Sequence, residues 1–147
     1  MLTRSHAKGL SKSELLRRCH KRLSRSLKQG FYIESIALIE TLMSDRLESL
    51  LSNLGKEPVQ LNTLGQQLGK VRKLGVLEDS FIEDLQIWNR KRHLAVHELV
   101  KMRETSDPDW NARIKFVRDS AREGDQLLKS LKAETARIKR FREMGLI

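Results

Sequence analysis

Apolar side chains recur at intervals of three and four residues along most of this chain, which is the periodicity of an α-helix. Proline, which interrupts helices, occurs only at Pro58 and Pro108, and no stretch alternates apolar and polar residues long enough to predict a strand. A length of 147 residues suits one domain with one core. We therefore expect an all-α fold, a single-domain helical bundle of about five helices.

Capping residues and glycines divide the chain into helical segments. We expect helices from about Ser11 or Ser13 to Gly30, from Phe31 to Leu54, from Asn62 or Thr63 to Lys73, from Glu78 to Arg90, and from Asp107 to Met144. Asp107 is well placed as the N-cap of the last helix, with Pro108 at its first position. The segment from Leu94 to Met102 has a weaker helical pattern. Trp88 is expected in the core, and Gly124 is a weak point of the last helix.

The net charge of +10 and the pI near 10.1 favour a polyanionic partner, because lysine and arginine that neutralise phosphates release counterions. Residues 1–28 hold nine lysines or arginines and a single acid, Glu14. Further basic runs are Arg90-Lys91-Arg92 and the group Arg137, Lys139, Arg140 and Arg142. The expected division is a basic N-terminal arm, residues 1–12, followed by a helical domain, residues 13–147. Each basic run has the alternative of being a solvated helix face, but together they favour a nucleic acid as partner, although charge alone does not specify which polyanion.

The single cysteine, Cys19, excludes an internal disulfide framework and a multi-cysteine zinc site. No apolar run approaches the roughly 20 residues that cross a bilayer, and residues 1–6 lack the apolar core of a signal peptide. We therefore expect a cytoplasmic protein without a membrane partner.

Several chemistries lack the residues they require. Gly65 and Gly69 lie in a helical pattern without the lysine and hydroxyl of a phosphate-binding loop. His93 and His97 have the spacing of metal ligands, but no third ligand is defined, so no metal or other cofactor is expected. A metal-dependent enzyme that uses these two histidines stays a minor alternative.

The stretch from Arg92 to His97 carries the strongest functional signal. Arginine grips phosphate with a planar fork of donors, and histidine moves protons near neutral pH, so the pair holds the groups needed to cleave RNA without a metal. The chain is rich in arginine, so the position of Arg92 four residues after Trp88 matters more than the spacing alone. In a continuous helix, residues five apart diverge by roughly 140°. Arg92 and His97 can therefore converge only if the helix breaks or two copies meet.

The apolar helix around Tyr32–Glu40, followed by a helix that ends in Arg92-His93, a short spacer and His97, resembles the HEPN superfamily. The resemblance covers about Ser13 to Leu131, and the residue after the arginine is commonly Asn, Asp or His in that family. It implies an all-α homodimer whose two motifs face one cleft. In many members, among them toxins, antiphage proteins and CRISPR effectors, this cleft is a metal-independent endoribonuclease site.

Carried onto this chain, the resemblance implies that Arg92 binds the scissile phosphate and His97 acts as general base or acid, leaving a 2′,3′-cyclic phosphate. His93 would orient the phosphate or the second histidine. It also implies a toxin or defence role and an antitoxin or other regulatory protein as partner. A toxin branch of the family has a tyrosine two positions after the histidine, where this chain has Leu99, which puts regulation by modification at that position in doubt.

Four further residues are expected to contact the substrate: Asn89, Arg90, Lys91 and Glu40. Glu40 lies in an apolar stretch, so if it is buried it needs a partner such as Arg92 or an incoming hydroxyl.

Two non-catalytic interpretations stand beside the nuclease. Arg92 could be a surface charge paired with Glu98 or Glu104, and His97 a histidine at the edge of the core. The chain would then be a basic helical adaptor that binds RNA or a partner protein through its terminal basic clusters.

Overall fold

The computed structural model describes residues 9–55, 63–99 and 104–147, and in these ranges it contains helices and no strand. The helices are α1 (Lys12–Gln29), α2 (Tyr32–Leu54), α3 (Leu64–Leu74), α4 (Asp79–Leu99) and α5 (Asp107–Glu143). The expectation of an all-α bundle of about five helices is confirmed. None of the described helices is long and apolar enough to cross a lipid bilayer.

The helix ends follow local capping signals in the sequence. The Ser11 hydroxyl accepts a hydrogen bond from the Glu14 amide, and Thr63 forms a reciprocal capping box with Gln66. Gly30 and Gly75 end α1 and α3 in the left-handed conformation, with φ of 78° and 66°. Side chains disfavour that conformation, so glycine stops both helices there.

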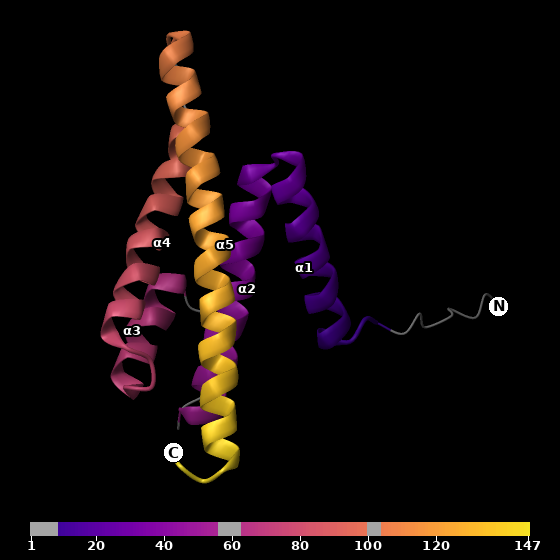
Figure 1. The fold of residues 1–147 in the computed structure, drawn as a ribbon, viewed down its shortest axis with the longest axis vertical. Helices are drawn as coiled ribbons and strands as arrows, with labels where there is room; N and C mark the ends of the chain where they lie inside the picture. Colours follow the sequence, from indigo (N-terminus) through magenta and orange to yellow (C-terminus); the bar gives the residue numbers. More distant parts are fainter. Residues whose placement is uncertain (1–8, 56–62, 100–103) are drawn as a thin grey trace, which may run out of the picture.

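The bundle is built around α2 and α5. Helices α1 and α2 form an antiparallel hairpin, and the long α5 lies along α2, with α4 on its other side and α3 beside α4 (Figure 1). The first turns of α5 extend beyond the ends of the other helices (Figure 1). Buried hydrogen bonds join the layers: the Ser26 and Ser35 hydroxyls link α1 to α2, and Ser44 donates to Gln67 to link α2 to α3.

Trp88 is fully buried between α4 and α5, as expected. Its indole nitrogen donates to the backbone oxygen of Ser120 at 2.8 Å. A Cβ added at Gly124 would lie 2.5 Å from the indole atom Cζ2, so only glycine allows α5 to approach the ring this closely. Gly124, expected as a weak point of the last helix, is therefore a packing position that fixes α4 against α5.

Two expectations about helix boundaries are wrong. Helix α4 continues without a break from Asp79 to Leu99, instead of ending at Arg90, because Trp88 and Ala95 both face the core seven residues apart. Ser106, not Asp107, caps α5: its hydroxyl accepts from the Asp109 amide, and Asp107 is the first helical residue. The arm at residues 1–8, the segment 56–62 with Asn62, and Val100–Met102 lie outside the described residues.

Candidate functional site

Arg92 lies at the centre of a polar cluster that bridges α2 and α4. Its Nη1 pairs with Glu40 Oε2 at 2.9 Å, which confirms the expected partnership of Glu40. Its Nε and Nη2 donate to Asn89 Oδ1 at 3.2 and 2.9 Å, and Nη2 also lies 3.1 Å from His93 Nε2. Because Trp88 is one turn earlier and faces the core, the stem of Arg92 lies at the core edge and its head reaches α2.

These contacts occupy most of the guanidinium. Arginine has five N–H donors, and the bonds to Glu40, Asn89 and His93 account for four of them. The Arg92 side chain is only 13% exposed, whereas Glu40 is 36% exposed. In this conformation Arg92 offers a phosphate one donor, and a bidentate grip requires that the phosphate take the place of Glu40.

His93 joins this cluster from the solvent side. An arginine N–H only donates, so His93 Nε2 is the acceptor in this contact. His97 is exposed one turn further along α4 and makes no hydrogen bond or ion pair with any residue in the described ranges. Its imidazole is therefore open to solvent and to a ligand.

Continuity of α4 keeps Arg92 and His97 apart within one chain. The two residues lie five apart in an unbroken helix, so they point in directions roughly 140° apart. Of the two ways in which the pair could converge, a helix break is excluded for this structure. The remaining way is contact with a second copy.

The other expected site residues divide between this cluster and neighbouring surfaces. Asn89 positions Arg92 rather than facing solvent freely. Arg90 is exposed and lies 3.6 Å from Glu83 on its own helix. Lys91 points to α5, where its Nζ pairs with Glu123 at 3.0 Å. The structure thus gathers Glu40, Asn89, Arg92 and His93 and leaves Arg90, Lys91 and His97 outside the cluster.

The solvent face of α4 beside the histidines is partly apolar. Leu94 is 55% exposed between His93 and His97, and Ile87 is exposed two turns earlier on the same side. Arg90 lies between them on this face. We call Ile87, Arg90, His93, Leu94 and His97 the α4 face.

Among the described residues, no group of three or more histidine, cysteine, aspartate or glutamate side chains is arranged to hold a metal ion. Glu98, which follows His97, lies 3.9 Å from Arg113 on α5. The metal-dependent alternative therefore gains no support from the arrangement of side chains around His93.

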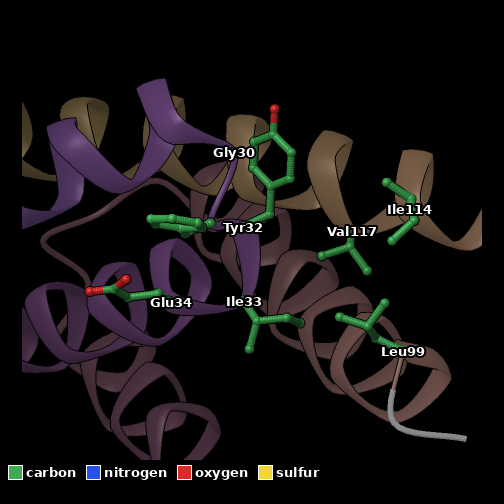
Figure 2. Close-up of a pocket in the computed structure, with 8 residues that line it drawn as sticks. Gly30, Tyr32, Ile33, Glu34, Leu99, Ile114 and Val117 are labelled. Atoms are coloured by element: carbon green, nitrogen blue, oxygen red, sulfur yellow. The ribbon is translucent and has the colours of Figure 1, made fainter.

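A separate hollow of about 450 Å³ lies where α2 begins and α4 ends. Figure 2 shows Ile33, Leu99, Ile114 and Val117 around it, so its wall is largely apolar. Glu34 is its one carboxylate, and that group pairs with Arg22 of α1. The hollow contains none of the expected site residues and has no obvious acid–base chemistry.

Sequence patterns did not predict a cluster of basic side chains formed by three different helices, α1, α2 and α5. Lys132 Nζ of α5 lies 2.9 Å from His20 Nδ1 of α1, and 112 positions separate the two residues. Burial, followed by the charges of Lys132 and Arg46, lowers the pKa of His20, and burial with the charge of Arg46 lowers the pKa of Lys132. No local motif could have indicated this contact, because it depends on how α1 and α5 pack on α2.

The chain matches no protein-family model, no curated protein and no solved structure.

Proposed function

We propose that this protein is a metal-independent endoribonuclease whose site forms where the α4 faces of two copies meet. The observation that carries the proposal is the fixed Arg92 guanidinium, held by Glu40, Asn89 and the exposed His93, with a second exposed histidine, His97, one turn further along α4. Fixed positive charge next to groups that transfer protons is the arrangement that phosphodiester cleavage requires. The resemblance of the Arg92–His97 stretch to the HEPN superfamily points to the same reaction.

Two features support a second copy as part of the site. Arg92 and His97 diverge within one chain, so a single copy cannot present both to one phosphate. Leu94 and Ile87 are exposed apolar residues in the middle of the α4 face, and such residues favour contact with another protein surface. The direction of His93 lies between those of Arg92 and His97, so a twofold axis beside His93 would bring Arg92 of one copy toward His97 of the other.

In this cleft one histidine removes the proton of the ribose 2′-hydroxyl, and the 2′-oxygen attacks the phosphorus. The bond from phosphorus to the 5′-oxygen breaks, and a second histidine returns a proton to that oxygen. The products are a 2′,3′-cyclic phosphate and a 5′-hydroxyl. Arg92 stabilises the charge on the phosphate with its remaining N–H and, as Glu40 is displaced, with a second one. Arg90 is exposed enough to contact a neighbouring phosphate.

The direct test is incubation of the purified protein with RNA in the presence of EDTA. Wild type should cleave, and Arg92→Ala and His97→Ala should each abolish cleavage. Arg17→Ala is the matched control, because Arg17 is an exposed arginine paired with Glu14 on α1 and should leave the rate unchanged. Absence of cleavage by wild type, or activity that survives both site changes, refutes the proposal.

Mixing the two inactive variants tests whether the site is shared. If Arg92 of one copy works with His97 of the other, a mixed dimer of Arg92→Ala and His97→Ala keeps one such pair, so the mixture should cleave RNA although neither variant does so alone. If each chain held its own complete site, the mixture would stay inactive.

A toxin or defence role, with an antitoxin or other regulatory protein as partner, belongs to this proposal as well. Expression of wild type in a bacterial host should then arrest growth, whereas expression of His97→Ala should not.

A second candidate function is binding of RNA without cleavage. The observation that favours it is that four of the five N–H donors of Arg92 already make bonds within the chain, so few are left for a phosphate. Under this alternative RNA binding falls steeply with salt and survives His97→Ala, and no cleavage products form.

A further inference from the structure

A groove of about 240 Å³ lies between the C-terminal halves of α2 and α5, on residues that the site around Arg92 does not include. Its polar lining comes from both helices: Arg46, Ser49 and Asn53 of α2, and Thr135, Lys139 and Arg142 of α5. Its floor is aliphatic, and none of the described residues that line it is acidic. The groove therefore presents three cations and three neutral polar side chains.

The three cations lack partners within the described part of the chain. Arg46, Lys139 and Arg142 make no ion pair or hydrogen bond with any residue in these ranges. Carboxylates of the same two helices are engaged elsewhere. Asp45 pairs with Lys12, Asp125 pairs with Lys129, and Glu134 pairs with Arg137. These three carboxylates therefore pair with cations outside the groove and do not neutralise Arg46, Lys139 and Arg142.

Positive charge continues from the groove toward α1. Lys132 lies one turn before Thr135 on α5 and contacts His20, and Arg46 acts electrostatically on both of these residues. A lysine nitrogen donates but does not accept, so His20 Nδ1 accepts from Lys132 and the imidazole is neutral. Burial, and then the charge of Arg46, lowers the pKa of both His20 and Lys132, and Asp125 opposes the shift only in part.

The spacing of these residues favours an extended ligand. Lys132, Thr135, Lys139 and Arg142 follow at intervals of three, four and three, so they form one row of about 15 Å along α5. Arg46, Ser49 and Asn53 form a parallel row on α2 at the same intervals. A single phosphate cannot contact the whole row. A groove of about 240 Å³ has room for part of one backbone, whereas a duplex is too wide to enter it.

We propose that this α2–α5 groove binds the phosphodiester backbone of a single-stranded nucleic acid. Arg46, Lys139 and Arg142 contact phosphates, and Ser49, Asn53 and Thr135 donate hydrogen bonds to phosphate or sugar oxygens. The proposal goes beyond the nuclease site and does not depend on whether the chain cleaves RNA.

Fluorescence polarisation with a labelled 2′-O-methyl RNA of about 20 nucleotides tests the groove. This probe lacks the attacking hydroxyl, so binding is measured separately from cleavage. The groove variant is Arg46→Gln/Lys139→Gln/Arg142→Gln. The matched control is Arg72→Gln/Lys115→Gln/Lys129→Gln, which removes the same charge from three cations that are already paired and lie outside the terminal basic runs. Thermal melts of both variants establish that they are folded.

The groove variant should bind about 50-fold more weakly at about 0.15 M salt, because each phosphate contact on a single strand releases about 0.7 counterion and contributes about a fourfold factor. The slope of log affinity against log salt should fall by about 2. The control should retain nearly the wild-type affinity. Equal losses in both variants would show that only net charge matters and would overturn the proposal.

Competition with single-stranded DNA and with inorganic phosphate tests whether the groove binds an extended backbone or a single phosphate. Single-stranded DNA of the same sequence should compete, since the groove reads the backbone, and the His20 ring resonances should shift when either strand binds. Inorganic phosphate should compete only weakly, because it contacts a small part of the row. Displacement of the RNA by phosphate at equal affinity, or a His20 resonance unchanged by RNA, would contradict an extended binding groove.

Discussion

Replacement of Gly124 by alanine tests the contact that fixes α4 against α5. In the interior of a helix this change normally stabilises by about 1 kcal/mol. Here the new Cβ would lie 2.5, 2.6 and 2.7 Å from Trp88 Cζ2, Cε2 and Nε1, and the indole is held in place by its hydrogen bond to Ser120. Overpacking costs about 1–3 kcal/mol, and loss of the hydrogen bond about 1 kcal/mol more.

The free energy of unfolding of Gly124→Ala should therefore fall by about 1–3 kcal/mol, measured by urea denaturation with circular dichroism. For a domain of this size the melting temperature falls by about 2–4 °C per kcal/mol. Gly69→Ala in α3 is the matched control, because nothing lies within 4 Å of a Cβ at that position, and it should be neutral or stabilising. In a Trp88→Phe background, which shortens the ring, the penalty of Gly124→Ala should shrink. A Gly124→Ala protein more stable than wild type would refute the close approach.

Glu40→Gln should lower the free energy of unfolding by about 1 kcal/mol or less, because the carboxylate is partly exposed and water screens its pair with Arg92; unchanged stability and unchanged cleavage in urea and nuclease assays would remove any role for Glu40. Leu94→Asp should convert a dimer to a monomer in light scattering and abolish cleavage, and an intact dimer would exclude the α4 face as the interface. NMR titration should place the pKa of His20 below 6.5, because burial and then the charges of Lys132 and Arg46 disfavour the imidazolium. The stability that neutral His20 contributes is fully present above pH 6.5 and is lost as the pH falls through the pKa of His20 in the folded protein. Lys132→Met should raise the pKa of His20, and an unchanged pKa would argue against the contact between the two side chains.

Local chemistry explains why most of the fold could be predicted from the sequence. Ser11 and Thr63 cap helices with their own hydroxyls, and Gly30 and Gly75 end them through their own backbone conformation. None of these signals depends on a distant residue. The break expected after Arg90 was wrong. The five polar residues between Trp88 and Leu94 interrupt the apolar pattern, while the continuing core contact is made by the small side chain of Ala95.

The candidate site was predictable mainly where its residues lie close together on a single helix. Asn89, Arg92 and His93 lie within five positions of α4, so their proximity follows from helix geometry. The pairing of Glu40 with Arg92 could be anticipated because a carboxylate in an apolar stretch requires a partner. The groove cations could not be predicted, since Arg46 and Lys139 become neighbours only when α2 packs against α5.

The continuity of α4 also determines which function a single copy could perform. Trp88 and Ala95 are both fully buried, so the faces of the residues between them are fixed, with Arg92 at the core edge and His93 and His97 toward solvent. Chemistry that needs Arg92 and His97 at one phosphate therefore requires a second copy, whereas binding in the α2–α5 groove requires only one. Measuring the molecular mass in solution therefore distinguishes the two proposals. If the protein is strictly monomeric and still binds RNA, the α2–α5 groove remains a valid binding site and the shared nuclease site is refuted.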